Sequence, residues 1–344
     1  SGGDIFQSLR PFFENNSISV LDVDICDFGP GCARQLSVVL SDCHKSLKSI
    51  RLDCNQLGDE RLADDIIAAL SAHPQQLEAL ALASMFMGTN ECTALFTAVR
   101  SMTRLHKLDL SCNIIDDQGV DIMVRALTNN IRLRILDLSN NNITARGCRS
   151  LATLLQNPNS NLENLDLLCN NVGDEGVLIF ANALASHRRL KALNLGNNNG
   201  ITAEGWSSFS KVLCDTASIN STYLSNHTFE CLGVLRLVHP RTMPADVRSL
   251  LALNSSSEDK SQVAIKKILQ HHGHFNMQPF FEWELKVLPI AIGWFEQARS
   301  IEGIDETVID KHKLGAMYEF IQAMPEVFEP VPAEQRERKG SGNS

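Results

Sequence analysis

Long apolar runs are absent from this chain of 344 residues. The longest uninterrupted apolar stretch lies near Val287–Phe295, well short of the ~20 residues that a membrane-spanning helix needs. The N-terminal segment SGGDIFQSLRPFF lacks the basic start and the apolar core of a signal peptide. The chain begins with Ser1 rather than methionine, so the sequence also fits a piece of a longer protein.

Cysteine and positive charge are scarce as well. Ten cysteines are too few for a disulfide framework, and none stands in a C-x-x-C pair. We therefore expect a cytoplasmic or nuclear protein with reduced thiols. Aspartate and glutamate outnumber lysine and arginine by 40 to 31, which gives a formal net charge of −9. This balance disfavours a nucleic-acid partner, which would need a basic surface, and we expect no membrane partner.

A repeat with a spacing of 28 to 30 residues governs the sequence. One clear copy is LHKLDLSCN, which begins at Leu105. The eight copies begin at Ile18, Leu47, Leu77, Leu105, Leu133, Leu162, Leu190 and Ile219. Each copy approximates L-x-x-L-x-L-x-x-N, and its alternating leucines predict a short strand with one buried face.

The ninth position of the repeat predicts a corner at which the chain leaves the strand. A stacked asparagine amide can donate to and accept from the backbone groups that a corner leaves unpaired. These ladder asparagines are Asn55, Asn113, Asn141, Asn170 and Asn198. A glycine and a helical pattern follow, and the residue after the glycine position is apolar in seven copies. Three of those residues, Cys32, Cys92 and Cys148, are therefore expected in the core.

One copy cannot bury its own apolar face, so neighbouring copies must stack. Strands stack at ~4.8 Å and helices at ~8–10 Å, which makes the stack curve. The predicted fold is α/β: a curved solenoid with a parallel concave sheet, convex helices and an all-helical C-terminal cap. We expect an N-terminal half repeat or cap helix at 1–17, eight strand segments within 18–235, a helical unit at 236–329 and a disordered tail at 330–344.

These residues resemble the ribonuclease-inhibitor type of leucine-rich repeat, which also occurs in NOD-like receptors and in Ran GTPase-activating proteins. The resemblance extends from about Ile5 to Phe229. It implies the solenoid fold and says little about function, because this fold serves many unrelated partners. The segments STYLSNHTFECLG and FIQAMPEVFE resemble the tail of leucine-rich repeat proteins of diatoms and related algae, which implies a source rather than a mechanism.

Sequence signals for catalysis are missing. No P-loop, H-E-x-x-H, G-x-S-x-G or G-x-G-x-x-G pattern occurs, so we expect no enzymatic activity and no cofactor. The HHGH segment at 271–274 offers three imidazoles for a metal, but a cationic histidine at a helix end also favours the helix dipole. No cysteine lies nearby, and we predict no metal site. Cys54, Cys112 and Cys169 lie two strand spacings apart, ~9.6 Å, beyond the ~7 Å that a disulfide tolerates.

The third, fifth and seventh positions of each copy point away from the buried face and form the predicted partner-binding surface. Their charged members are Asp22, Asp24, Arg51, Asp53, Lys107, Asp109, Asp137 and Asp166. Six acids against two bases predict a negative stripe that steers a basic protein partner. The alternative is that these aspartates only reflect the common L-D-L consensus sequence of the repeat.

The third copy, LALASMFMGTNE, departs from the pattern. Met85 stands at the asparagine position, Glu91 stands at the glycine position, and three alanines leave the concave surface bare. Phe86 and Ile114 share one loop column in adjacent copies, and they complete the predicted partner-binding set as an apolar anchor. The alternative is a degenerate copy whose Met85 and Phe86 turn inward.

The seventh copy carries one extra residue. It predicts a bulge in which Gly200 takes a positive φ, followed by Trp206 as a packing residue. Taken together, the patterns favour a non-enzymatic interaction scaffold that binds a protein partner on the concave face. The alternative is a GTPase activator of the Ran type, because VDICDFGPG at Val23–Gly31 resembles a segment of that family. The acidic tail of that family is missing, and Cys26 replaces the ladder asparagine. The partner's identity and the oligomeric state stay open.

Overall fold

The structure is a computed structural model, and it describes residues 18–23, 47–52, 76–233, 243–257 and 259–271 together with positions 11, 38, 67 and 70. The chain divides into two compact units. The first comprises Ser1–Asp215 and Ser225–Lys260, and the second comprises Thr216–Leu224 and Ser261–Ser344.

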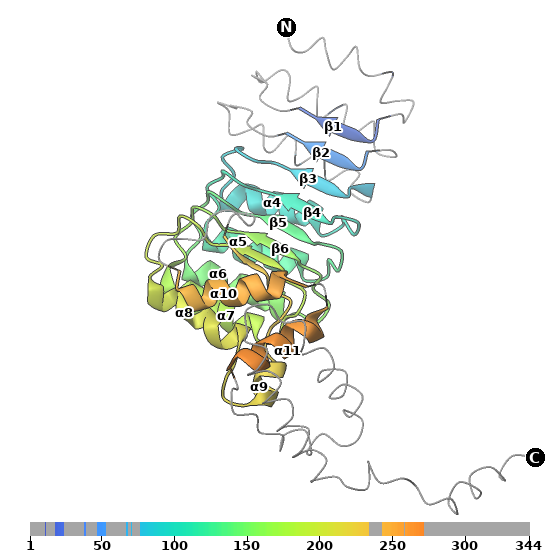
Figure 1. Cartoon of the computed structure of the whole chain (residues 1–344). Helices are drawn as coiled ribbons and strands as arrows, with labels where there is room; N and C mark the ends of the chain where they lie inside the picture. The colour runs from blue at the N-terminus through green and yellow to red at the C-terminus, as the bar shows by residue number, and fades with distance from the viewer. Residues whose placement is uncertain are drawn as a thin grey trace, which may run out of the picture. The chain divides into compact units, whose positions relative to one another are not determined.

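Eight short parallel strands form one open sheet in the first unit, in the order of the chain (Figure 1). They are β1 (Val20–Asp22), β2 (Ser49–Arg51), β3 (Ala79–Ala81), β4 (Lys107–Asp109), β5 (Ile135–Asp137), β6 (Asn164–Asp166), β7 (Ala192–Asn194) and β8 (Cys231–Leu232). Equivalent repeat positions pair with one another: Leu108 pairs with Leu136, which pairs with Leu165. The predicted parallel-sheet solenoid is therefore confirmed.

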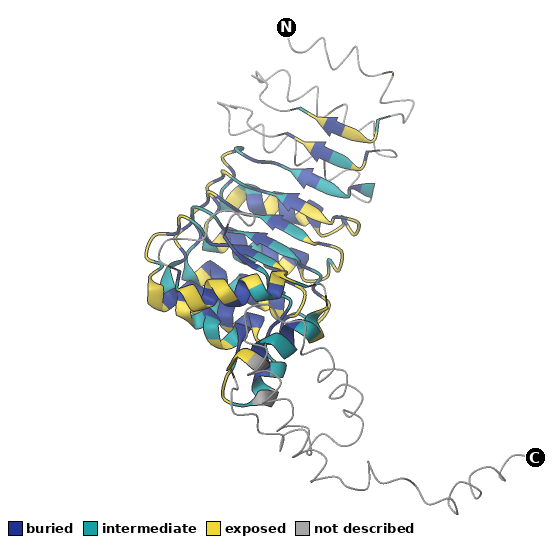
Figure 2. Ribbon diagram, viewed as in Figure 1, coloured by how far each residue is buried: buried dark blue, intermediate teal, exposed yellow. Residues whose placement is uncertain are grey.

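Helices alternate with the strands along the chain. The repeat helices are α4 (Thr89–Val99), α5 (Asp117–Leu127), α6 (Ala145–Gln156), α7 (Gly173–Leu184), α8 (Ala203–Leu213) and α10 (Ala245–Ser255). Each of these helices contacts the next one in this order. Figure 2 shows the central residue of the strands and one side of the helices buried, and these residues form one core cluster. Two of the three cysteines expected in this core, Cys92 and Cys148, are fully buried, as predicted. Cys32 lies outside the described residues.

Helix α4 begins differently from its neighbours. In α5 the side chain of Asp116 accepts a hydrogen bond from the Gly119 amide at 2.9 Å, which satisfies one of the amides that a helix start leaves unpaired. In α4 the preceding residue is Gly88, which has no side chain for this task. Glu91 instead accepts from the Gly88 amide at 2.8 Å. This contact explains why a glutamate replaces the repeat glycine in the third copy.

The eighth strand lies elsewhere than the sequence pattern predicts. Residues from Ile219 form a short helix, α9 (Ile219–Tyr223), and the strand that pairs with β7 is Cys231–Leu232. The buried leucine positions of the eighth copy are taken by Phe229 and Leu232, both fully buried, so this copy begins ten positions later than the regular spacing indicates. The segment from Ile219 places Thr222 where the repeat needs a large apolar side chain, which is why it cannot continue the sheet.

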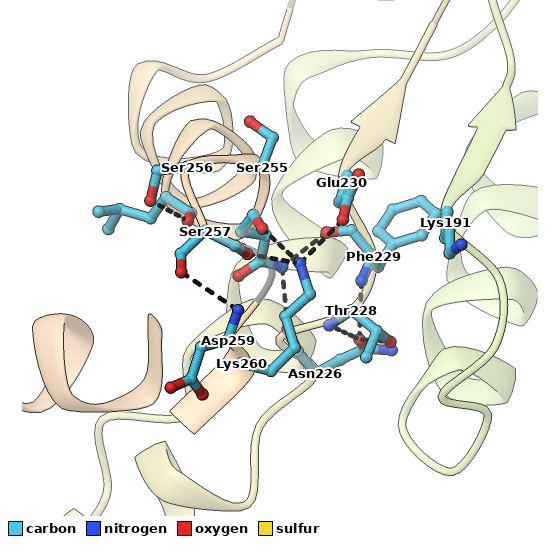
Figure 3. Close-up of polar contacts among 12 residues, drawn as sticks. Lys191, Asn226, Thr228, Phe229, Glu230, Ser255, Ser256, Ser257, Asp259 and Lys260 are labelled. Atoms are coloured by element: carbon cyan, nitrogen blue, oxygen red, sulfur yellow. Dashed lines mark hydrogen bonds and ion pairs between the residues drawn. The ribbon is translucent and has the colours of Figure 1, made fainter. Parts of the chain in front are cut away.

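Helix α10 continues the row of repeat helices. It contacts α8 and β8 and belongs to the same compact unit as the strands. Asn254 of α10 donates to the carbonyls of Asn226 and Phe229 at 3.0 and 2.6 Å. Lys260 donates to Glu230 at 2.8 Å (Figure 3). It also donates to the Asn254 carbonyl at 2.8 Å. The boundary expected after residue 235 therefore does not separate α10 from the repeats.

Aromatic residues fill the core beside the last repeats. Trp206 is buried, as predicted, and its ring lies 6.5 Å from that of Phe209. The Phe209 ring lies 5.9 Å from that of Phe229. Gly200 has φ +83°, which confirms the predicted bulge.

The second unit contains α9 and, from Ser261 onward, most of α11 (Lys260–His271). The expected N-terminal segment 1–17, apart from position 11, and the expected tail 330–344 lie outside the described residues, and those domain limits stay predictions. No helix in the described part of the chain is long and apolar enough to cross a membrane.

Candidate functional site

The asparagine ladder forms the corner at which each strand ends. Asn113, Asn141, Asn170 and Asn198 are all buried, while Asn55 lies outside the described residues. In Asn141 the amide group donates to three backbone carbonyls, and its Oδ1 accepts from the Ile115 amide at 2.9 Å. The Asn141 side chain therefore pairs backbone groups of the corner that the turn would leave without a partner.

The third copy forms the same corner without an asparagine of its own. Met85 is buried in the core, whereas Phe86 turns outward and is 67% exposed. The neighbouring Asn113 compensates, because its Oδ1 accepts from the amides of both Met85 and Met87 at 3.0 Å. Phe86 takes φ +55°, a left-handed conformation that an aromatic residue adopts at a cost of ~1–2 kcal/mol. The inward alternative thus holds for Met85 and fails for Phe86.

Phe86 and Ile114 lie in neighbouring loops, as the sequence predicts. Ile114 is 51% exposed, and its side chain lies against Gly88, where an added Cβ would stand 3.6 Å from Ile114 Cδ1. The two residues offer apolar surface at the ladder edge of the sheet. Ala79 and Ala81 are half-buried and Ala83 is buried, so the concave face of this copy is bare.

The fifth repeat position places three aspartates side by side on the concave face. Asp109 of β4 pairs in register with Asp137 of β5, which pairs with Asp166 of β6. At ~4.8 Å per strand, the carboxylates form one column. All three are half-buried.

The half-burial has a structural cause. Asp109 Oδ1 accepts from the amide and the hydroxyl of Ser111 at 3.1 and 2.8 Å. Asp137 Oδ1 accepts from the same two groups of Ser139 at 2.9 and 2.7 Å. Each aspartate thus caps the end of its own strand, as aspartate does in an Asx-turn. These contacts give the repeat-consensus interpretation a physical basis. They account for one carboxylate oxygen of Asp109 and one of Asp137.

Electrostatics distinguish Asp137 from the aspartates beside it. Burial raises the pKa of Asp137, and the negative charges of Asp109 and Asp166 raise it further, while the contacts with Ser139 act in the opposite direction. Asp166 has a further partner, because Asn194 Nδ2 donates to both of its oxygens at 3.0 and 2.9 Å. Asp137 lies in the middle of the column between two like charges.

The other predicted partner-binding residues are spread along the same face. Asp22 of β1 and Arg51 of β2 are exposed and pair in register, and Lys107 of β4 is exposed at the third repeat position. Asp24 and Asp53 lie outside the described residues.

Sequence reasoning missed a second set of contacts between repeats. Asp117 in the first turn of α5 accepts from the amide and hydroxyl of Thr144 at 2.8 and 2.6 Å and from the Gly147 amide at 2.9 Å. It thereby caps α6, the helix of the next repeat. Gly147 is needed here, because a Cβ would stand 2.7 Å from Asp117 Oδ1. Asp174 accepts from Thr202 in the same way. An acid at the helix start followed by threonine one repeat later is the signal that predicts this contact.

In the described part of the chain, no group of three or more histidine, cysteine, aspartate or glutamate side chains is placed to hold a metal ion. Burial raises the pKa of Cys92 and of Cys148 to about 12, which leaves both as inert thiols. Cys112 and Cys169 are free cysteines, as expected, and Cys54 lies outside the described residues. His271 is exposed at the end of α11, and the rest of the 271–274 segment is not among the described residues.

Comparison with known proteins identifies the repeat. A family model described as Leucine Rich repeat matches residues 101–121, 129–152, 159–181 and 187–210. The chain is 35% identical to the ribonuclease inhibitor of Sus scrofa over 160 residues, which cover 46% of this chain and 34% of that protein. The matched segments are leucine-rich repeats, and the chain is similar to that inhibitor. This confirms the predicted resemblance.

A second relative is named for its NACHT, LRR and PYD domains. The chain is 32% identical over 215 residues to NACHT, LRR and PYD domains-containing protein 13 of Homo sapiens. The match covers 61% of this chain and 20% of that relative. The chain thus spans a fifth to a third of the length of these two relatives. A solved structure titled as the yeast Rad7 and Elc1 complex aligns over 70% of each chain with 12% identity and a TM-score of 0.40. Of the Ran-type segment Val23–Gly31, only Val23 is among the described residues.

Proposed function

We propose that this protein is a non-enzymatic interaction scaffold whose concave face binds a basic protein partner through the column of Asp109, Asp137 and Asp166. The observation that carries the proposal is the register of β4, β5 and β6, which stacks three carboxylates on one face. The family supports the class of function, since the relative from Sus scrofa is named for inhibiting a ribonuclease, which is itself a protein.

The charge arrangement favours a cationic ligand. Asp137 is half-buried between two like charges, and burial together with those charges raises its pKa. A lysine or arginine side chain placed over the column would reduce this repulsion and would be attracted to all three carboxylates. Among the described residues, the serine contacts involve Oδ1 of Asp109 and of Asp137, and the second oxygen of each carboxylate is available for a ligand there.

The exposed apolar pair gives the site a second component. Phe86 is held outward by a left-handed backbone, and Ile114 lies in the adjacent repeat beside it. Left-handed backbone at a non-glycine residue clusters at active sites and ligand-binding sites. We assign the aspartate column to encounter and the pair Phe86 and Ile114 to retention of the partner.

The test uses variants that keep the fold. In Asp109→Asn/Asp137→Asn, the asparagine oxygen can still accept the serine hydrogen bonds while two negative charges disappear. Glu175→Gln/Glu204→Gln removes the same charge from exposed positions on α7 and α8 and serves as the matched control. Capture from native lysate followed by mass spectrometry identifies partners that the wild type and the control retain and the aspartate variant loses.

Kinetics with such a partner then separate the two components. We expect the aspartate variant to slow association several-fold at low salt, with a smaller effect at ~0.15 M ionic strength. We expect Phe86→Ala to raise the dissociation rate instead. Equal binding by all variants would place the site elsewhere. Stimulation of GTP hydrolysis by a Ran-type GTPase would contradict the non-enzymatic assignment.

A further inference from the structure

A hollow of about 660 Å³ lies at the opposite edge of the sheet from the asparagine ladder. Its basic lining residues are Arg104, His106, Arg132 and Arg134, which immediately precede β4 and β5. Glu78, Ile131 and Asn161 complete the wall. All of these residues lie at the N-terminal ends of neighbouring parallel strands, from β3 to β6, so four successive repeats build one cavity. Its volume falls in the range of small-ligand and peptide pockets.

Charges alternate along this edge on both sides of the hollow. Lys48 lies 3.7 Å from Glu78, Arg134 lies 3.7 Å from Glu163, and Lys191 lies 3.0 Å from Glu163. These residues occupy the second position of their repeats, and a cation faces an anion across each of these pairs. The fourth repeat interrupts the alternation with His106, which stands between Glu78 and Arg134. His106 is also part of the wall of the hollow.

Two arginines of the lining lie outside this pattern, each one position before the start of a copy. Arg104 Nη1 donates to the neutral Gln76 Oε1 at 2.8 Å, and Arg132 makes no side-chain ion pair with any residue of the described chain. Both side chains are exposed. The acid of the lining, Glu78, already faces Lys48. The hollow therefore carries a local excess of positive charge on a chain whose net charge is −9.

We propose that this hollow binds an acidic peptide segment of a protein partner, with its carboxylates on Arg104 and Arg132. Guanidinium groups bind carboxylates through two parallel hydrogen bonds, which makes an arginine pair a specific reader of this group. Ile131 is 55% exposed on the same wall and offers an apolar contact to a neighbouring side chain of the peptide. A nucleic-acid backbone fits less well, because its further phosphates would meet Glu78, Glu163 and the aspartate column.

The proposal concerns a surface distinct from the concave aspartates, and its test needs no natural partner. The probe is a fluorescein-labelled, amidated peptide of sequence GLEELG, and GLQQLG is its neutral control. Fluorescence anisotropy with the full chain measures both affinities at low and at ~0.15 M ionic strength. We expect GLEELG to bind more tightly than GLQQLG and to weaken as salt rises.

Variants locate the binding. Arg104→Gln/Arg132→Gln should reduce the affinity for GLEELG on the order of tenfold or more. Arg104→Lys/Arg132→Lys keeps the charge but not the planar fork, so its loss should be intermediate. Arg125→Gln/Arg146→Gln removes two exposed arginines from α5 and α6 and should leave the affinity close to the wild type. Circular dichroism confirms that each variant is folded.

Three results would overturn the assignment. Equal binding of GLEELG and GLQQLG would show that the hollow does not read carboxylates. An equal loss in the Arg125→Gln/Arg146→Gln control would show that only overall charge matters. Tighter binding of a thymidine hexanucleotide, with the same dependence on Arg104 and Arg132, would assign the hollow to nucleic acid instead.

Discussion

Loss of the Asn141 side-chain amide leaves fewer backbone groups without a hydrogen-bond partner than the number of its hydrogen bonds indicates. Asn141 Nδ2 donates to the carbonyls of Leu110, Leu138 and Ser139 at 3.0 to 3.2 Å. Each carbonyl has a second donor, and these are Asn113 Nδ2, Asn170 Nδ2 and the Cys112 amide. The ladder therefore shares its carbonyls. Asn141→Ala would leave only the Ile115 amide without a partner among the described residues.

Loss of the Asn113 side chain affects more backbone groups, because Asn113 also binds the corner of the third copy, which has no asparagine of its own. Its Oδ1 accepts from the amides of Met85 and Met87, both at 3.0 Å. Its Nδ2 donates to the Leu82 carbonyl at 3.0 Å, and no second donor reaches that oxygen in the described part of the chain. Asn113→Ala would thus leave two amides and one carbonyl unsatisfied.

A buried unsatisfied polar group costs ~1–3 kcal/mol. We therefore expect Asn141→Ala to lower the free energy of unfolding by ~1–3 kcal/mol and Asn113→Ala to lower it by about two to three times as much. Asn170→Ala is the matched control for Asn141→Ala. It too leaves a single amide, that of Ile143, without its acceptor.

Urea unfolding followed by far-ultraviolet circular dichroism measures these free energies, with the slope on urea checked for constancy among the variants. The three asparagines lie in neighbouring repeats, so the same cooperative region reports on each of them. An Asn113→Ala loss no larger than that of Asn141→Ala would refute the shared-carbonyl account. It would also refute the idea that Asn113 compensates for Met85.

Three further predictions follow from single contacts. Asp117→Ala should cost ~0.5–2 kcal/mol of unfolding free energy, as loss of a helix cap does, whereas Glu175→Ala on the helix surface should cost less than half of that. In thiol labelling at pH 8, Cys92 should stay unmodified in the folded protein because its pKa is raised to about 12, while the exposed Cys112 reacts; rapid labelling of both would contradict the packing. The raised pKa of Asp137 means that the folded state holds its proton more tightly than the unfolded state, so this residue's contribution to stability falls as pH rises from the unfolded pKa of ~3.9 through the folded value. Asp137→Asn should remove that fall and leave unfolding at pH 7 equal or harder, and a clear destabilisation at pH 7 would show that the carboxylate itself is needed.

The repeat pattern predicts most of the fold because one physical requirement recurs in each copy. Leucines at alternate positions need burial, the corner needs an amide, and both demands appear at a fixed spacing, so the strand register can be read directly. The prediction failed at the eighth copy. Regular spacing there favoured Ile219, but the apolar residues that the sheet requires are Phe229 and Leu232. Periodicity describes the average repeat, and burial of particular side chains decides where an irregular copy resumes.

The candidate site was only partly predictable. The column of Asp109, Asp137 and Asp166 follows from the register, but the serine contacts that half-bury it depend on side-chain geometry that the spacing does not express. Phe86 turned outward because its neighbour Met85 could fill the core, a choice between two apolar residues that composition leaves open. The basic hollow needs residues from four repeats, and it becomes visible only when those repeats are placed side by side.

The acidic column and the basic hollow lie on the same strands but at different positions of the repeat. His106 and Asp109 are three residues apart, and so are Arg134 and Asp137. At ~3.3 Å per residue, the two features are separated by ~10 Å along each strand. This distance is close to the Debye length of ~10 Å at 0.1 M ionic strength. Near physiological salt each feature therefore acts on a ligand largely by itself, whereas at low salt their fields oppose each other. Removing charge from the aspartate column should consequently tighten GLEELG binding at low ionic strength and leave it nearly unchanged at ~0.15 M. An equal effect at both salt concentrations would mean that the two surfaces are coupled through the structure of the sheet rather than through charge.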